Sequence, residues 1–172
     1  MVDNRVILIL DFETIISDLL GRGSVAKEEP PEEERATASI EDGRILMADD
    51  SPIVRDTIAR ALQLAGYRNV TVCNDGEHAW QTIISQRQSE GKPFDVVLSD
   101  IEMPRMDGLH LTARIKHDQE LAGIPVILFS SIVSDENLNK GRAVGADAQV
   151  AKTDVDGLLL TIRAQLEKSM QN

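Results

Sequence analysis

Polar side chains that could perform chemistry follow four of the apolar runs in the sequence. They are Asp49 and Asp50, Asp100, Ser130 with Ser131, and Lys152. Three carboxylates held close together repel one another unless a cation lies between them. A hard divalent ion with oxygen ligands relieves this repulsion, and Mg²⁺ also keeps free positions for phosphate oxygens and water. We therefore expect a Mg²⁺ site among the three carboxylates.

The same residues could handle a phosphoryl group. A carboxylate can accept a phosphoryl group and form an aspartyl phosphate. The ammonium of Lys152 would then neutralise charge on the transferred group, and the Ser130 hydroxyl could hydrogen-bond one of its oxygens. The residue types alone therefore favour phosphoryl chemistry.

Alternating strand and helix signals predict how these residues are positioned. Short apolar runs predict strands at residues 45–48, 69–73, 94–99, 125–130 and 148–151. A helix is expected after each strand: Ser51, Asp75 and Ser134 are predicted N-caps, and Asp107 with Gly108 opens the third helix. This alternation indicates βαβ units, and hence a doubly wound parallel sheet with helices on both faces. Because such sheets bind ligands at the carboxyl ends of their strands, we expect the polar residues to face one cleft.

The composition excludes several function classes. The chain has 172 residues and a net charge of −11, so nucleic-acid backbones and anionic membranes would be repelled. Its single cysteine, Cys73, excludes an intramolecular disulfide framework and a zinc site made of several thiolates. The longest apolar runs, such as residues 6–10, are too short to span a bilayer or to form a signal peptide. We expect a cytoplasmic protein that binds no nucleic acid and does not insert into membranes.

Three regions of the chain differ in composition. Residues 1–20 contain an apolar run at 6–10, which predicts a buried strand, and then an amphipathic helical stripe. Residues 21–43 carry glycines, prolines and acidic clusters, which predict a flexible linker, and residues 44–172 hold the alternating strands and helices. The strand and helix of residues 1–20 cannot bury their apolar faces alone. We expect this segment to dock onto the larger domain or to pair with its copy in a homodimer.

Residues 44 to about 168 resemble the receiver domains of bacterial two-component response regulators. The resemblance rests on Asp49-Asp50-Ser51, on Asp100-Ile-Glu-Met-Pro-Arg-Met-Asp-Gly108, and on Ser130 and Lys152, in this order and spacing. It implies a flavodoxin-like α/β fold whose five parallel strands are ordered 2-1-3-4-5. It also implies a regulatory phosphoacceptor domain, rather than an enzyme, that takes its phosphoryl group from a histidine kinase.

The resemblance implies a role for each matched residue. Asp100 is expected to be the phosphoacceptor. Asp49 and Asp50 match the acidic pair of the family, with Asp50 as the direct metal ligand. The backbone carbonyl of Glu102 matches the remaining protein ligand of Mg²⁺. Ser130 stands at the position of the switch hydroxyl, with Ser131 beside it, and Lys152 matches the phosphoryl-binding lysine.

Two positions depart from the receiver pattern. Thr153 follows Lys152, where the family usually has a proline in a cis bond. A cis bond before a residue other than proline costs about 3 kcal/mol, which leaves open a trans bond and a shifted loop. Gln149 stands three residues before Lys152, where the family often has an aromatic residue that swings inward on activation. We therefore expect an output switch that does not use an aromatic rotamer at this position.

The start of the chain carries a second resemblance. Residues 2–13, with the predicted helix after them, resemble the end of a CheW-like coupling domain. Such a domain joined to a receiver is similar to the CheV-type chemotaxis proteins. This similarity implies a chemotaxis histidine kinase as partner and a place in a receptor–kinase signalling complex. Two alternatives stay open: a stand-alone receiver that acts as a phosphate sink, and a phosphohydrolase that uses Asp11 or Asp50.

Overall fold

One parallel sheet forms the centre of the described structure. The computed structural model describes residues 40–91, 93–131 and 134–170, so the segment predicted at 1–20 and most of the predicted linker lie outside it. The strands are β1 (Arg44–Ala48), β2 (Asn69–Cys73), β3 (Val96–Asp100), β4 (Val126–Ser130) and β5 (Ala148–Ala151). Their order is β2-β1-β3-β4-β5, and all four pairings are parallel, which confirms the predicted topology.

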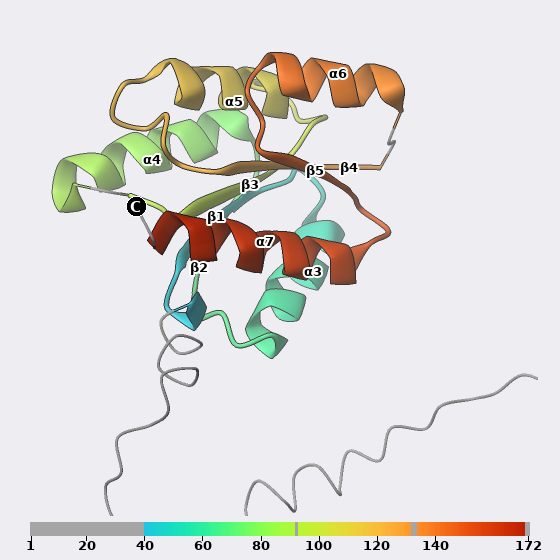
Figure 1. The fold of residues 1–172 in the computed structure, drawn as a ribbon, viewed down its shortest axis with the longest axis horizontal. Coiled ribbons are helices and arrows are strands. Elements are labelled where there is room, and N and C mark those ends of the chain that lie inside the picture. The colour runs from blue at the N-terminus through green and yellow to red at the C-terminus, as the bar shows by residue number, and fades with distance from the viewer. Residues whose placement is uncertain (1–39, 92, 132–133, 171–172) are drawn as a thin grey trace, which may run out of the picture. The chain divides into compact units, whose positions relative to one another are not determined.

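Helices cover both faces of this sheet (Figure 1). They are α3 (Pro52–Leu64), α4 (Gly76–Glu90), α5 (Gly108–His117), α6 (Asp135–Ala143) and α7 (Val155–Met170). The helices α3 and α7 lie on one face, and α4, α5 and α6 lie on the other. None of the described helices is long and apolar enough to cross a membrane.

Side-chain caps begin four helices at the residues that the sequence predicted. The side chains of Ser51, Asp75, Asp107 and Ser134 accept hydrogen bonds from the backbone N–H groups of Val54, His78, His110 and Asn137 respectively. At the other end of α3, Gly66 follows the helix with a φ of 96°, a left-handed conformation that glycine adopts without strain. These caps fix where each helix begins, and therefore how short the loops at the strand ends are.

The sheet separates two apolar clusters. Along β1, Leu46 and Ala48 belong to one cluster, which also contains residues of α4 and α5. Ile45 and Met47 belong to the other, which also contains residues of α3 and α7. Successive residues of a strand point to opposite faces, so a central strand covered by helices on both sides is apolar along its length. Acidic side chains appear where β1 and β3 end.

Two strands begin later than the sequence predicted. β3 begins at Val96 rather than at residue 94, although Phe94 is buried in the core. β4 begins at Val126, because Pro125 has no N–H to donate to the ladder. The carbonyl of Pro125 still accepts a hydrogen bond from Val97 N–H at 2.9 Å. Burial of a side chain and membership of a strand are separate properties, which is why the apolar runs overestimate strand length.

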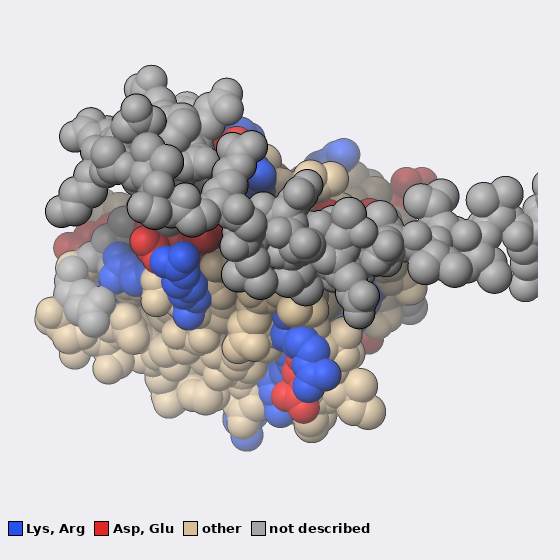
Figure 2. Space-filling view, turned by 90° about the horizontal axis from the view of Figure 1, so that it is seen from below, with Lys and Arg blue, Asp and Glu red and all other residues tan. Residues whose placement is uncertain are grey.

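Basic side chains lie apart from one another on the part of the surface that Figure 2 shows. On the face shown in Figure 2, the visible Lys and Arg side chains lie in separate groups, and several lie next to acidic side chains. Among the described residues, Arg68 pairs with Glu41 and Asp42, and Arg163 pairs with Glu167. The visible part of this face therefore does not present the continuous basic patch that a nucleic-acid backbone needs.

Candidate metal centre

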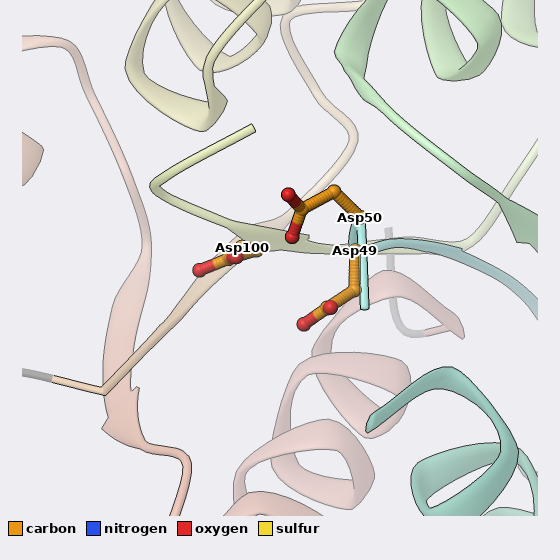
Figure 3. A group of neighbouring side chains, drawn as sticks. All are labelled: Asp49, Asp50 and Asp100. Carbon is orange, nitrogen blue, oxygen red and sulfur yellow. The ribbon is translucent and has the colours of Figure 1, made fainter. Parts of the chain in front are cut away.

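Three aspartates meet at the carboxyl ends of β1 and β3, which are neighbouring strands (Figure 3). Asp49 and Asp50 follow β1, and Asp100 is the last residue of β3. One carboxylate oxygen of each lies within 4.8 Å of one carboxylate oxygen of the other two. Asp49 and Asp100 are 1% and 5% exposed, whereas Asp50 is exposed. The structure thus brings together the three carboxylates that the sequence predicted would meet.

Lys152 supplies a positive charge to this cluster. It lies directly after β5, and its Nζ is 2.7 Å from Asp49 Oδ2 and 2.8 Å from Asp100 Oδ2. Its backbone N–H donates to the carbonyl of Ser130 at 2.9 Å, which fixes the loop after β5 against the end of β4. One ammonium thus contacts two of the three carboxylates, and the cluster has a net negative charge when all three are ionised.

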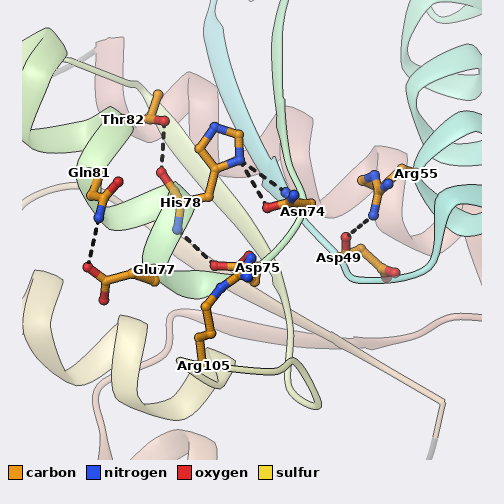
Figure 4. A network of polar contacts seen from close by, with 9 residues as sticks. All are labelled: Asp49, Arg55, Asn74, Asp75, Glu77, His78, Gln81, Thr82 and Arg105. Carbon is orange, nitrogen blue, oxygen red and sulfur yellow. Dashed lines mark hydrogen bonds and ion pairs between the residues drawn. The ribbon is translucent and has the colours of Figure 1, made fainter.

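The protein holds the side chain of Asp49 in one orientation. Its Oδ1 accepts a hydrogen bond from Ser51 N–H at 2.8 Å. Its backbone carbonyl accepts one from Arg55 Nη1 at 2.7 Å, as Figure 4 shows. Its Oδ2 is buried and receives no hydrogen bond of good geometry, although the Lys152 ammonium lies at ion-pair distance. Buried polar atoms normally have hydrogen-bond partners. This oxygen can therefore interact with a further cation.

The donor set of the cluster fits a hard divalent cation. All three groups are carboxylates, whose oxygens are ligands that Mg²⁺ prefers. The exposed Asp50 leaves the cluster open to water and to a phosphoryl group. Within the part of the chain that the structure describes, this is the one cluster of three or more acidic, histidine or cysteine side chains that could hold a metal ion.

Burial and Lys152 have opposite effects on the protonation of Asp100. Burial raises the pKa of Asp100, and the hydrogen bond and positive charge of Lys152 only partly oppose this rise. Burial alone would lower the pKa of Lys152, but its close contacts with Asp100 and Asp49 and their negative charges outweigh burial and raise that pKa. Lys152 therefore stays protonated at neutral pH. Burial thus favours the protonated form of Asp100, whereas Lys152 favours the carboxylate, which is the form that can act as a nucleophile.

A tight loop after β3 carries Glu102. The backbone of Glu102 is among the groups that lower the pKa of Asp100 against the effect of burial, and the Glu102 side chain is exposed. Gly108 closes the loop, because its N–H donates to the carbonyl of Ile101 at 2.9 Å. A Cβ on Gly108 would overlap the carbonyl oxygen of Asp100, so this close approach requires glycine. The loop thus holds the backbone of Glu102 beside Asp100.

Of the remaining predicted site residues, Ser130 and Ser131 lie near the aspartates and Gln149 does not. Ser130 ends β4 and is buried, and Ser131 follows it and is exposed, so both lie at the same edge of the sheet as the aspartates. Gln149 does not join them. Its side-chain Nε2 donates to the carbonyl of Leu138 at 3.0 Å, which places Gln149 between β5 and α6.

The structure adds contacts that the sequence analysis did not anticipate. Arg55 reaches back from α3 to the carbonyl of Asp49, and its place one turn into the helix could have signalled this contact. Arg105 forms an ion pair with Asp75, from a different loop, and no spacing pattern signals it. The bond between Lys152 and the residue after it is trans, because the described residues contain no cis peptide bond.

Comparison with known sequences identifies related proteins. Residues 45–163 match the family model described as the response regulator receiver domain. The chain is 36% identical over 112 residues to the gliding motility regulatory protein of Myxococcus xanthus, covering 65% of this chain and 14% of that protein. It is 30% identical over 171 residues to the chemotaxis protein CheV3 of Helicobacter pylori, covering 97% of this chain and 53% of that protein. The chain therefore spans about half or less of the length of these two relatives.

Solved structures show the same fold. The chemotaxis protein CheY4 of Vibrio cholerae, crystallized at low pH, matches with a TM-score of 0.63 and 29% identity, over 72% of this chain and 98% of that one. The receiver domain of the histidine kinase CKI1 from Arabidopsis thaliana, complexed with Mg²⁺, matches with a TM-score of 0.62 and 28% identity, over 71% of this chain and 90% of that one. These matches confirm the predicted flavodoxin-like fold.

Proposed function

The chain belongs to the response regulator receiver family, and from this premise we propose that Asp100 accepts a phosphoryl group from a histidine kinase. Receiver domains are regulatory phosphoacceptor domains of two-component signalling. The observation that carries the proposal is the contact of Lys152 with the buried Asp100 inside a cluster of carboxylates. An ammonium in this position can stabilise a phosphoryl group that arrives at Asp100.

The reaction exchanges one bond to phosphorus for another. An oxygen of the Asp100 carboxylate forms a bond to phosphorus, and the bond from phosphorus to the histidine nitrogen of the kinase breaks. The Lys152 ammonium, which lies 2.8 Å from Asp100 Oδ2, neutralises negative charge on the transferred group. The hydroxyl of Ser130, at the end of β4, donates a hydrogen bond to one of the phosphoryl oxygens.

Asp50, Asp100 and the backbone carbonyl of Glu102 would bind Mg²⁺ directly, and Asp49 would complete the acidic group that holds the ion. When bound, the ion neutralises charge on the phosphoryl oxygens and orients them. Asp49 supports these ligands, because Ser51 and the lysine ammonium fix its carboxylate. The donor set of the cluster supports this assignment, as does the Mg²⁺ complex of the CKI1 receiver domain.

Phosphorylation would change a protein-binding surface around residues 134–151. Ser130 leads into the loop before α6, so movement of its hydroxyl toward the phosphoryl group would bias the arrangement of that loop and helix. Gln149 provides a hydrogen-bonded amide between β5 and α6 in place of an aromatic residue. The similarity to CheV3 supports chemotaxis signalling, with a chemotaxis-type histidine kinase and a receptor–kinase complex as partners.

The organisation of the chain before the sheet stays a prediction. The structure describes residues from 40 onward, so the assignments of residues 1–20 and of the linker at 21–43 lie almost entirely outside it. We propose that residues 44–172 form the receiver domain. Pairing of residues 1–20 with their copy in a second chain remains the expected route to a homodimer.

Incubation with acetyl phosphate and Mg²⁺ tests the proposed function. Intact mass spectrometry should find one added phosphoryl group on the wild-type chain and none on Asp100→Asn, whose circular dichroism spectrum should be unchanged. Asp56→Asn is the matched control, because Asp56 is exposed on α3, and it should be labelled like the wild type. Equal labelling of Asp100→Asn and wild type would overturn the assignment. Repeated turnover of phosphate esters would instead favour the phosphohydrolase alternative.

A further inference from the structure

Asp75 and Arg105 form an ion pair that the proposed phosphoryl chemistry does not use (Figure 4). Asp75 is fully buried, and its Oδ1 accepts the capping hydrogen bond from His78 N–H at 2.9 Å. Its Oδ2 receives no hydrogen bond of good geometry and faces the guanidinium of Arg105. A buried carboxylate without a counter-charge is strongly unfavourable. The burial of Asp75 therefore favours keeping Arg105 in this place, although most of the Arg105 side chain is exposed.

Arg105 also has an unusual backbone conformation. Its φ is 65°, and it is the only residue other than glycine with a positive φ in the described part of the chain. A residue with a Cβ adopts this conformation at a cost in free energy, so the conformation persists only where the surroundings impose it. The ion pair with Asp75 is one contact that imposes it.

The loop that carries Arg105 is fastened to the start of α4 at a second point. Gly76 N–H donates to the carbonyl of Met106 at 3.2 Å, and a Cβ on Gly76 would overlap that oxygen. The side chains of Met103 and Met106 are buried in the core cluster that also contains residues of α4 and α5. The loop at residues 101–107 is therefore held from the side of α4.

The other end of the same loop reaches the carboxylate cluster. Glu102 lies three residues before Arg105 and two residues after Asp100, and its backbone acts on the Asp100 carboxylate. The carbonyl of Glu102 is the proposed backbone ligand of the metal. A shift of the loop by about 1 Å would weaken both interactions, because reactive sites tolerate only small misplacements.

We propose that Asp75 and Arg105 are positioning residues that hold the Glu102 backbone against the metal and phosphoryl site. This inference rests on the proposed function of Asp100. Neither residue belongs to the carboxylate cluster, so the pair acts through the loop and not by touching the phosphoryl group. The start of α4 thereby helps to set how tightly the site binds a divalent cation.

Mg²⁺ titrations of single and double variants, followed by NMR chemical shifts, test this coupling. Arg105→Gln removes one charge of the pair, and Asp75→Asn removes the other while asparagine keeps the N-cap. Each single substitution should weaken Mg²⁺ affinity about tenfold, the lower end of the range for residues that orient metal ligands. The double variant should bind Mg²⁺ with about the same affinity as the single variant that binds it more weakly, because both substitutions break the same ion pair.

Arg114→Gln is the matched control for the lost positive charge. Arg114 is a half-exposed arginine of α5 that lies 3.8 Å from Glu77 and contacts no residue of the loop at 101–107 in the described ion pairs. Its substitution should leave Mg²⁺ affinity within about twofold of the wild type. Equal affinities of Arg105→Gln and Arg114→Gln, or fully additive effects of Arg105→Gln and Asp75→Asn, would overturn the proposal.

Amide hydrogen exchange without metal gives a second measurement that does not depend on the proposed function. In Arg105→Gln, exchange at residues 101–107 should be about tenfold faster than in the wild type, with the exchange of β1 and β3 unchanged. Unchanged exchange in the loop would overturn the positioning role, even in a chain that is phosphorylated on Asp100. A wild-type chain that binds no Mg²⁺ and accepts no phosphoryl group would instead refute the proposed function, whatever the exchange rates.

Discussion

Lys152 balances a cluster that contains more carboxylates than cations. Its Nζ contacts the buried carboxylates of Asp49 and Asp100 at 2.7 and 2.8 Å. Moving a charge out of water costs several kcal/mol, and a well-placed opposite charge offsets this cost. In the proposed function the same ammonium must also interact with a phosphoryl group. If the proposed function holds, Lys152 both stabilises the buried carboxylates before phosphorylation and neutralises charge on the phosphoryl group during it.

Replacement of Lys152 by methionine should lower the free energy of unfolding by about 3 kcal/mol, because two buried carboxylates lose their counter-charge. Urea denaturation at pH 7 measures this change, and added Mg²⁺ should restore part of the loss. Lys140→Met is the control, because Lys140 pairs with Glu136 on the surface and should contribute less than about 0.5 kcal/mol. Equal losses in the two variants would show that Lys152 does not compensate the burial of the carboxylates.

At the scale of elements, Gln149 and Gly141 determine how α6 packs on β5. Gly141 is the buried residue of α6, and the side-chain amide of Gln149 lies against it. The same amide donates to the carbonyl of Leu138. A hydrogen bond with fixed geometry thus joins the helix to the strand that leads to the lysine of the cluster.

Gly141→Ala should destabilise the fold by about 1–3 kcal/mol, because the new Cβ would overlap the side-chain amide of Gln149. In a Gln149→Ala background the same substitution should cost less than about 1 kcal/mol, since only the end of the Leu128 side chain then has to shift. Urea denaturation of the wild type, both single variants and the double variant measures the interaction between the two positions. Additive losses would contradict this packing.

The turn after α5 depends on the charge of Asp118. Its Oδ1 accepts hydrogen bonds from Glu120 N–H at 3.0 Å and Leu121 N–H at 3.3 Å, and its Oδ2 accepts one from Arg87 Nη1 at 2.9 Å. Burial alone would raise the pKa of Asp118, but these hydrogen bonds and the arginine charge lower it. Because the pKa is lower in the folded chain, the ionised carboxylate stabilises the fold.

The contribution of Asp118 should be complete above its ordinary pKa of 3.8 and disappear as the pH falls through the lower pKa of the folded chain. Asp118→Asn keeps an oxygen for the two N–H groups and removes the charge. At pH 7 the wild type should be more stable by about 0.5–1 kcal/mol, and the difference should shrink below about pH 4. Urea denaturation at both pH values checks this, and a difference independent of pH would contradict it.

Local signals explain which elements could be predicted from the sequence. The N-cap at Ser51 and the apolar runs depend only on residues that are close in the sequence, so they can be recognised from the sequence alone. The meeting of Asp50 with Asp100 was predictable too, because parallel strands end at the same edge of a sheet. The pair of Asp75 and Arg105 was not predictable, because two loops must fold toward each other and an arginine must adopt a left-handed conformation.

At the scale of the whole molecule, the net charge of −11 attracts cations to every acidic surface. This general attraction is screened over about 8 Å at physiological ionic strength. A specific site, by contrast, binds the ion with particular oxygen ligands and is little affected by a monovalent salt. Stabilisation by Mg²⁺ therefore has to be compared with stabilisation by NaCl at the same ionic strength.

Mg²⁺ should stabilise the wild-type chain through the carboxylate cluster. At ten times its dissociation constant, an ion that binds only the folded chain adds about 1.4 kcal/mol to the free energy of unfolding. Asp50→Asn should lose this increment, and without Mg²⁺ it should be more stable than the wild type, because one repelling carboxylate is gone from the cluster. Thermal unfolding in MgCl₂ and in NaCl of equal ionic strength measures both effects.

Asp56→Asn makes the same change of charge on the exposed side of α3 and should keep the full Mg²⁺ increment. If Asp50→Asn and Asp56→Asn respond equally to Mg²⁺, the ion acts on the charge of the whole molecule and not at the cluster.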